Sequence, residues 1–142
     1  MIRKKRKLRS LFFAVCLLFA ARPGAAFAAE GGIVVNGTDL LQAPGQTVPC
    51  GNGSARYDAG TNTLTLENAD ISADPAGNPL IYGIQIDREN VTVRLVGKNT
   101  VSGHYGIGSS RPFRLEGTGG GTLTIRAAQD PGLPGNPCRG IF

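Results

Sequence analysis

Several residue types and patterns on which large classes of protein depend are missing from this chain of 142 residues. There is no tryptophan. The single histidine, His104, lies in a turn with no nucleophile or second metal ligand at short spacing, so nothing indicates a catalytic triad or a zinc site. No stretch after residue 28 has the apolar period of a helix, and no basic cluster marks a face for nucleic acid. We therefore expect no catalytic residues, no metal, no cofactor and no nucleic-acid partner.

The positive charge of the chain is concentrated at its amino end. Six lysines and arginines lie between residues 3 and 9, an apolar run covers Leu11–Ala21, and Ala26-Phe27-Ala28 has the small residues of a cleavage site. This pattern predicts a Sec-type signal peptide over residues 1–28, and its 11 apolar residues are too few for a membrane span, which needs about 20. Without residues 1–28, eight basic and ten acidic residues give a net charge of −2. We expect a secreted or cell-surface product with no membrane contact after cleavage.

The remaining chain, residues 29–142, is rich in glycine and proline, with 20 and eight of them. Its alternating Leu, Val and Ile residues can bury apolar surface, which argues for short strands joined by turns and against disorder. Two cysteines lie in this part, Cys50 and Cys138, and an oxidising compartment allows them to form a disulfide. The alternative is two isolated cysteines, each buried in its own part of the fold.

A short phrase of sequence is repeated along the chain. Gly83-Ile84 precedes the strand pattern Val91–Leu95, and Gly106-Ile107 stands 23 residues later, before the strand pattern Phe113–Leu115. Gly140-Ile141 opens the phrase a third time. A period of this length is typical of solenoids, in which runs too short to form a core alone stack about 4.8 Å apart and align their apolar residues.

These patterns predict an all-β fold, a parallel β-helix of about three rungs. In this prediction residues 29–56 form an N-terminal cap, where Asn36-Gly37 between apolar runs indicates a β-ribbon that covers the first rung. Residues 57–142 form the rungs, with glycine-containing corners at Gly97–Thr100 and Glu116–Thr118. The alternative is an antiparallel β-sandwich, a class that also has short strands and frequent turns.

Four segments resemble the repeats of a known group of proteins. They are Tyr57–Ile71, Val93–Val101, Gly106–Gly108 and Gly119–Ile125. They are similar to the β-helical repeat and carbohydrate-binding-type domains of secreted and cell-surface proteins from Gram-positive, gut-type bacteria, and the resemblance covers roughly residues 31–141. It implies a right-handed β-helix and a carbohydrate-binding or adhesin-like role. Its motifs are more specific for the fold than for the ligand.

Two tyrosines are the candidate binding residues. Tyr82 and Tyr105 each precede a Gly-Ile pair and stand one period apart, and Arg139 has the matching place before Gly140-Ile141. On a shared face, the three side chains would offer two aromatic rings and a guanidinium fork, which suit a sugar ring or a uronate carboxylate. The alternative is an external tyrosine ladder that only stabilises the coil, and the lack of tryptophan argues against a strong sugar platform.

Many β-helices are polysaccharide lyases or hydrolases, which place acidic and basic side chains together on one outer face. The residues that could serve in this way are Asp58, Asp70, Asp74, Asp87, Glu89, Arg88 and Arg94. The densest group, residues 87–90, has the composition of a solvated turn before a strand, and about three rungs leave little room for a groove. We therefore expect that the chain is not an enzyme.

The sequence thus predicts an exported, non-catalytic surface module with a polysaccharide as its partner. One alternative is a structural spacer segment of a larger surface protein, and a more remote one is a polysaccharide lyase or hydrolase. Because Gly140-Ile141-Phe142 begins a rung that the sequence does not complete, we also expect an open apolar end. Such an end predicts end-to-end self-association of copies, or continuation in a longer protein.

Overall fold

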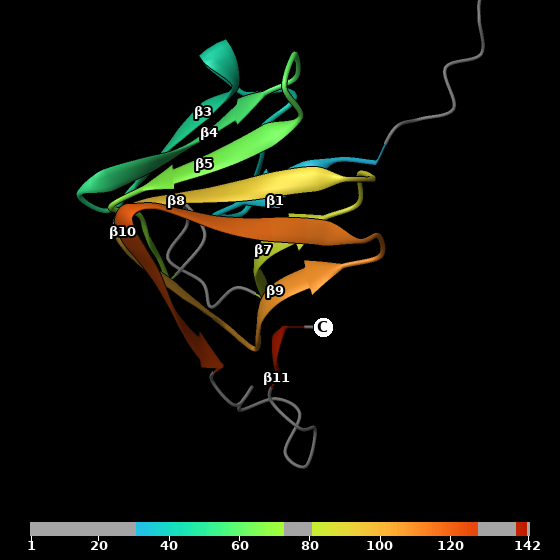
Figure 1. The fold of residues 1–142 in the computed structure, drawn as a ribbon. Coiled ribbons are helices and arrows are strands. Elements are labelled where there is room, and N and C mark those ends of the chain that lie inside the picture. Colours follow the sequence, from blue (N-terminus) through green and yellow to red (C-terminus); the bar gives the residue numbers. More distant parts are fainter. Residues whose placement is uncertain (1–30, 73–80, 128–138, 142) are drawn as a thin grey trace, which may run out of the picture.

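The computed structural model describes residues 31–72, 81–127 and 139–141 of the chain, and these residues form strands joined by turns (Figure 1). The strands are β1 (Ile33–Val35), β2 (Thr38–Asp39), β3 (Thr47–Cys50), β4 (Gly53–Asp58), β5 (Thr63–Glu67), β6 (Asp70–Ile71), β7 (Tyr82–Ile86), β8 (Val91–Gly103), β9 (Tyr105–Ser109), β10 (Phe113–Ala127) and β11 (Arg139–Ile141). A 3-10 turn, η1 (Pro44–Gln46), precedes β3. The all-β prediction is confirmed, while the predicted signal peptide lies outside the described residues.

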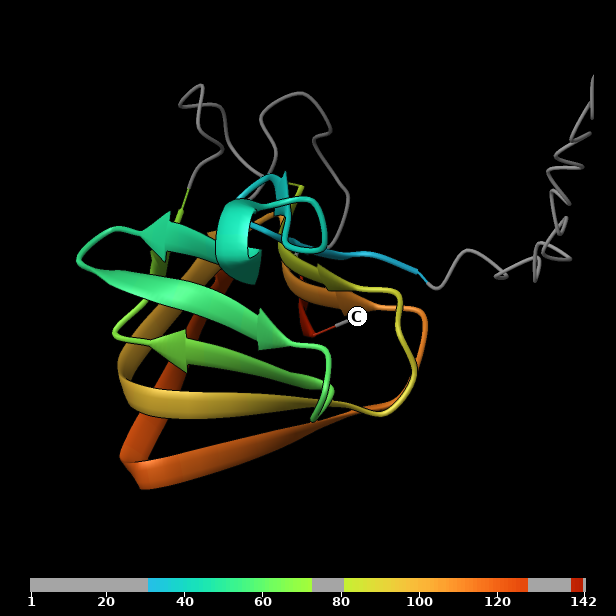
Figure 2. The ribbon, with the colours of Figure 1, turned by 90° about the horizontal axis from the view of Figure 1, so that it is seen from above.

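The strands form two mixed sheets. The first sheet has the order β11-β9-β7-β1-β2, and the second has the order β10-β8-β5-β4-β3, with β6 paired to the later part of β8. β1 is antiparallel to β2 and to β7, and β4 is antiparallel to β3 and to β5. The neighbours β5, β8 and β10 run parallel to one another, and so do β7, β9 and β11. Figures 1 and 2 show the two sheets on opposite sides of one interior. Facing sheets fit the sandwich alternative, but both contain parallel and antiparallel pairs.

The predicted hairpin at Asn36-Gly37 is confirmed. Val35 pairs with Thr38 across a two-residue turn, and both turn residues have positive φ, 52° at Asn36 and 74° at Gly37. Positive φ at both positions is what a hairpin turn that follows the right-handed twist of the strands requires. Through Ile33, which pairs with Ile86, the hairpin forms the antiparallel neighbour of β7 at the start of the parallel part of the first sheet.

The parallel pairs keep the period that the sequence shows. Tyr82 pairs with Tyr105, 23 residues later, in the first sheet, and Val91 pairs with Phe113, 22 residues later, in the second. In β8 the corner lies at Gly97, where φ is 67°. In β10 the corner lies at residues 119–121 and not at the predicted Glu116–Thr118, because Gly119 and Gly120 carry the positive φ values of 58° and 79°. There β10 has two more residues than β8, since Thr118 pairs with Val96 and the next pair is Thr122 with Lys98.

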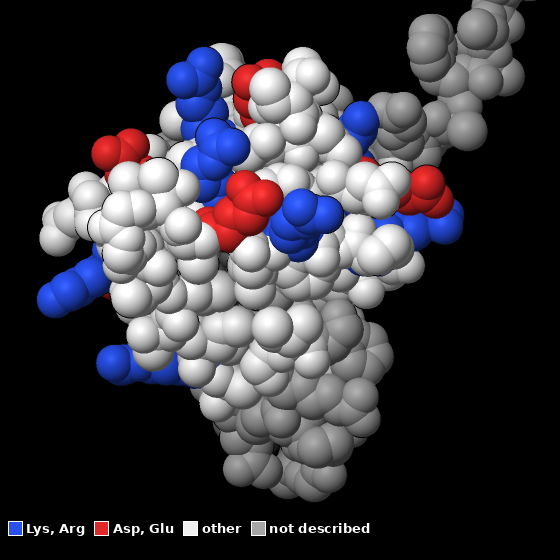
Figure 3. Space-filling model, viewed as in Figure 1, with Lys and Arg blue, Asp and Glu red and all other residues white. Residues whose placement is uncertain are grey.

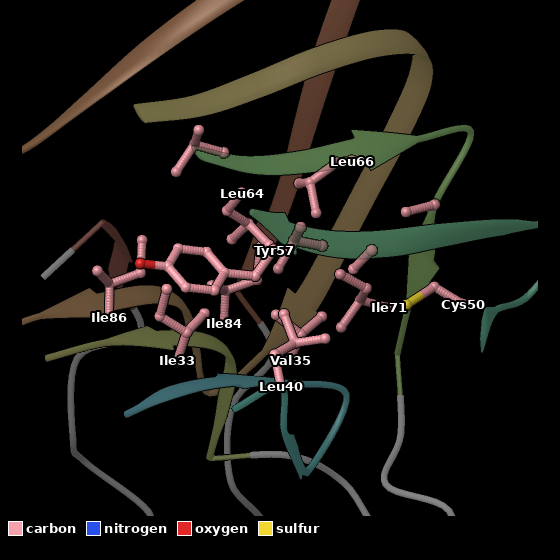
Figure 4. Packing of buried hydrophobic residues seen from close by; sticks show 14 of the residues in the cluster. Ile33, Val35, Leu40, Cys50, Tyr57, Leu64, Leu66, Ile71, Ile84 and Ile86 are labelled. Carbon is pink, nitrogen blue, oxygen red and sulfur yellow. The ribbon is translucent and has the colours of Figure 1, made fainter. Parts of the chain in front are cut away.

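The core lies between the two sheets. Figure 4 shows Tyr57 and Leu64 of the second sheet pointing toward Ile33 and Ile84 of the first. Each of these side chains is buried, and burying a large apolar side chain stabilises the folded state by roughly 1.5–3 kcal/mol. The Tyr57 hydroxyl donates a hydrogen bond of 2.7 Å to Oδ1 of Asn62, so its polar end is satisfied at the edge of the core.

Burial decreases toward β10. Val91 and Val93 of β8 are fully buried. Of their neighbours in register on β10, Phe113 is only partly buried and Leu115 is 41% exposed. Among the described residues, β10 pairs with β8 alone. The apolar row of the second sheet therefore continues onto β10 without the cover that it has on β8.

Candidate functional site

The structure brings Tyr82 and Tyr105 together. They stand at the first residues of β7 and β9 and are paired in register. Their rings are stacked, with centroids 5.2 Å apart and an interplanar angle of 25°. This is an offset-stacked geometry of the kind that aromatic pairs prefer. The sequence prediction that one period would align the two side chains is confirmed at the level of this contact.

The glycine after each tyrosine explains why the rings lie on the outer face. A Cβ added at Gly83 would collide with Cγ1 of Val101, and one added at Gly106 would collide with Cγ2 of Ile125, so both glycines face the interior. Successive residues of a strand point to opposite faces, so Tyr82 and Tyr105 point outward. The ring of Tyr82 lies against Gly108, where an added Cβ would collide with its Cδ1 and Cε1 atoms.

The tyrosine pair has two further neighbours. His104, in the bend between β8 and β9, is buried and packs edge-on against Tyr105, with ring centroids 4.5 Å apart at an angle of 76°. The main chain of Arg139 in β11 pairs with Tyr105. At the level of the backbone, the three positions that the sequence period selected therefore stand in one row across β7, β9 and β11.

A small hollow of about 200 Å³ is lined in part by Tyr82. Its lining residues are Tyr82, Gln85, Asp87, Gly108, Ser109 and Ser110. The carboxylate of Asp87 accepts a hydrogen bond from Nε2 of Gln85 (2.8 Å) on one oxygen and from Oγ of Ser110 (2.9 Å) on the other. Its backbone N–H donates to the carbonyl of Gly32 (3.0 Å). The carboxylate is thus held in one orientation in a hollow that Tyr82 also lines.

Gln85, Ser109 and Ser110 were not predicted from the sequence, and Asp87 was predicted only as a member of the acidic group. The signal that could have found them was the period itself. Ser110 stands 23 residues after Asp87 and contacts it, and Oγ of Ser109 donates to the carbonyl of Ile86 (2.9 Å), also 23 residues apart. The period of the sequence therefore indicated which of these residues would be neighbours, but it did not indicate that their side chains would form hydrogen bonds.

The acidic group at residues 87–90 is divided among separate partners. Asp87 belongs to the hollow, whereas Glu89 forms an ion pair of 3.1 Å with Arg111. The guanidinium carbon of Arg88 lies 5.7 Å from the ring centroid of Tyr57. The described contacts thus give this group no paired-carboxylate arrangement of the kind that glycoside hydrolysis uses.

The other acidic candidates lie elsewhere. Asp58 is exposed at the end of β4, Asp70 is exposed at the start of β6, and Asp74 lies outside the described residues. The backbone N–H of Gly60 donates to the Asp58 carboxylate (2.8 Å), and this hydrogen bond, with one from Thr61, lowers the pKa of Asp58 below its usual value. Within residues 31–72, 81–127 and 139–141, no group of three His, Cys, Asp or Glu side chains could hold a metal ion.

Cys50 is buried at the end of β3. Its thiol donates a weak hydrogen bond to the carbonyl of Val48 (3.6 Å), and burial raises the pKa of the thiol to about 11. A thiol with such a pKa is a poor nucleophile at neutral pH. Cys138 lies outside the described residues, so its disulfide with Cys50 stays a prediction.

A larger hollow of about 580 Å³ lies between the β1–β2 hairpin and β3. Its lining residues are Asn36, Thr38, Asp39, Gln42, Ala43, Pro44, Thr47, Val48 and Pro49. Size alone would favour it as a binding site. However, its lining contains no aromatic ring on which a sugar could stack, whereas the Tyr82 hollow combines a ring with an oriented carboxylate.

The charged surface shows no concentration of one sign on the face in Figure 3, where Lys and Arg side chains are interspersed with Asp and Glu. In the part of the chain that the structure describes, no helix has the length and apolar character needed to cross a membrane. In comparisons with family models, curated proteins and solved structures, none matches this chain.

Proposed function

We propose that this chain is an exported, non-catalytic surface module that binds carbohydrate on the outer face of the first sheet, around Tyr82 and Tyr105. The observation that carries the proposal is the stacked tyrosine pair beside a hollow with an oriented carboxylate. Sugar rings present an apolar C–H face and a rim of hydroxyl groups. An aromatic ring next to fixed hydrogen-bonding groups matches both features.

The fold that we propose for the repeated part is a short, right-handed parallel β-helix, closed at one end by the antiparallel strands β1 to β4. Three hydrogen bonds join residues that are 23 apart and support it: Ser109 to Ile86, Ser110 to Asp87, and Asn99 Nδ2 to the carbonyl of Thr122. In a coil of this kind, identical outward positions of successive rungs form rows. Such rows allow one face of the coil to make the same contact with successive sugar units of a polysaccharide.

Secretion is part of the same proposal. The basic segment, the apolar run and the Ala26-Phe27-Ala28 site in residues 1–28 support export by a Sec-type signal peptide. A carbohydrate-binding or adhesin-like module acts where polysaccharides are, outside the cell or on its surface.

Tyr82→Ala is expected to weaken polysaccharide binding by about fivefold to tenfold, because an aromatic contact of this kind contributes about 1 kcal/mol beyond its buried area. The ligand is first found by probing the purified chain on a glycan array, and its affinity is then measured by calorimetry. Tyr82→Phe, which keeps the ring, should retain most of the affinity. Ile81→Ala removes a neighbouring side chain that is 63% exposed and should change little. Equal losses at Ile81 and Tyr82, or no loss at either, would contradict the proposed site.

A second role, structural contact with another copy of this chain, is favoured by β10. Phe113, Leu123 and Ile125 on its inner side are only partly buried and Leu115 is 41% exposed, although they continue the fully buried row of β8. A strand that pairs on one side only, as β10 does among the described residues, offers its other edge for pairing with a neighbouring chain. The occupant that we expect is β10 of a second molecule.

Leu115→Glu is expected to shift the purified protein from dimer toward monomer, because it places a charge in the apolar row of that contact. Thr124→Glu adds the same charge on the opposite, solvent-facing side of the same strand and serves as the matched control. Sedimentation velocity at several concentrations measures the masses. A wild-type chain that stays monomeric throughout would rule out the second role and leave carbohydrate binding unaffected.

A further inference from the structure

The charge of the residues that line the hollow beside Tyr82 indicates which charge a ligand can have, whereas the tyrosine pair alone does not. The sequence suggested either a sugar ring or a uronate, and the uronate depended on a guanidinium fork from Arg139. The described lining of the hollow contains no Lys or Arg, and its one charged side chain is Asp87. A negative group at the point of contact attracts hydroxyl donors and repels another carboxylate.

We infer that this hollow selects a sugar without a carboxylate, whose hydroxyl groups donate to Asp87 while its ring packs against Tyr82. This inference rests on the proposed carbohydrate binding. A carboxylate has about four acceptor positions, and Gln85 and Ser110 occupy one on each oxygen, so about two remain for hydroxyl groups of a ligand. Neighbouring hydroxyls of a pyranose ring are suited to such a pair of acceptors.

The surroundings fix the carboxylate before a ligand arrives. Asp87 is held through its backbone N–H by Gly32 and through both oxygens by Gln85 and Ser110. Ser109 Oγ lies within hydrogen-bonding distance of the carbonyls of Ile86 (2.9 Å) and Arg111 (2.5 Å) and can donate its single hydrogen to either, which fixes the turn that presents Ser110. Little side-chain freedom is therefore left to lose when a sugar binds.

Two described arginines that are adjacent in sequence to residues of the hollow, Arg88 and Arg111, are directed to other partners. Arg111 forms its ion pair with Glu89, and Arg88 lies over the Tyr57 ring. A uronate is best recognised by a guanidinium that presents two parallel N–H groups to it, and binding one here would require Arg111 to leave Glu89. The volume of the hollow, about 200 Å³, suits one sugar ring of a chain.

The test uses the purified protein and calorimetric titration with two groups of polysaccharide. The neutral group contains glucan, mannan, galactan and xylan, and the acidic group contains polygalacturonate and alginate. Methyl-esterified polygalacturonate is the matched probe, because it has the backbone of the acid without its charge. We expect ligands in the neutral group, and uronates that bind at least about tenfold more weakly, the effect expected of an unpaired like charge. A uronate that binds as tightly as the best neutral glycan, in a manner sensitive to Tyr82→Ala, would overturn this inference and leave the proposed function standing.

Asp87→Asn should weaken binding of the neutral ligand by about tenfold, since hydrogen bonds to a charged group are the stronger ones. Glu67→Gln removes the same charge from an exposed position on the second sheet and should leave the affinity unchanged. The preference of the wild-type protein for neutral over acidic polymers needs no variant, so it tests the inference even where Asp87→Asn fails to fold. Binding to no glycan in either group would overturn both this inference and the proposed function.

Discussion

Replacing Asn99 by alanine is expected to lower the free energy of unfolding by about 3 kcal/mol, because the buried backbone N–H of Ala69 and the part-buried carbonyls of Val96 and Thr122 would lose their partner at once. Asn99 is buried at the corner of β8. Its Oδ1 accepts a hydrogen bond from the backbone N–H of Ala69 (2.9 Å). Its Nδ2 donates to the carbonyls of Val96 and Thr122, both at 3.2 Å. One amide side chain therefore joins the corners of three successive passes of the chain.

Each buried backbone group that is left without a partner costs about 1–3 kcal/mol, and the missing side chain adds a cavity. For a domain of this size, the loss corresponds to a melting temperature lower by about 10 °C or more. Asn52→Ala provides the matched control, because Asn52 is exposed in the turn between β3 and β4. Its effect should stay within about 0.5 kcal/mol. Urea denaturation followed by circular dichroism measures both variants, and similar midpoints for the two would show that the Asn99 hydrogen bonds do not join the corners.

The Asn99 corner also shows how far the sequence could be interpreted. The period of the sequence correctly predicted that the patterns at Val91–Leu95 and Gly83-Ile84 recur one pass later, because apolar residues and glycine are the residues that strands and corners need. The period could not place the corner of β10, since three consecutive glycines at residues 119–121 allow several bends. Only the packing of Gly121 against the carbonyl of Leu95 fixes which of them is used.

The amino-terminal strands illustrate a second limit. The hairpin at Asn36-Gly37 has a local signal, and it was predicted. The antiparallel pairing of β4 with β5, in which Tyr57 lies beside Leu64 in the same sheet, was not predicted, although a short turn joins the two strands. As a result β4, Gly53–Asp58, crosses the boundary that the sequence placed between a cap and the rungs. A tight turn has a local signal in composition, whereas the strands that each strand pairs with, and their direction, depend on tertiary packing.

The candidate site was predictable to the same extent. The sequence period aligned Tyr82 with Tyr105, and the stacked rings follow directly from a parallel register. Asp87 looked like part of a solvated turn, because nothing in its local sequence distinguishes a carboxylate in water from one held by Gln85 and Ser110. The distinction depends on β9 lying beside β7 in register, so it becomes visible only in the fold.

Alanine at Gly83 is expected to destabilise the fold by about 2–3 kcal/mol, which gives the Gly-Ile pairs a steric explanation. A Cβ at Gly83 would collide with Cγ1 of Val101 and lie only 2.9 Å from the carbonyl oxygen of Ser102. At Gly106 it would collide with Cγ2 of Ile125 and lie 2.7 Å from the carbonyl oxygen of Gly140. Backbone oxygens cannot move aside as a side chain can. The first sheet would therefore have to separate from β8 or β10 to admit the methyl group.

The third glycine of the same phrase supplies the control. A Cβ at Gly140 would lie 3.5 Å from Cγ2 of Ile125, an ordinary van der Waals contact, so Gly140→Ala should change the stability by no more than about 0.5 kcal/mol. Gly106→Ala should resemble Gly83→Ala. Thermal unfolding of the three variants separates a steric requirement from a mere preference for glycine before isoleucine. If all three variants lose the same stability, close approach of the sheets is not the reason for the motif. A loss of stability at Gly83 and Gly106 alone would show that close packing of the first sheet against Val101 and Ile125 leaves no room for a methyl group at these two positions.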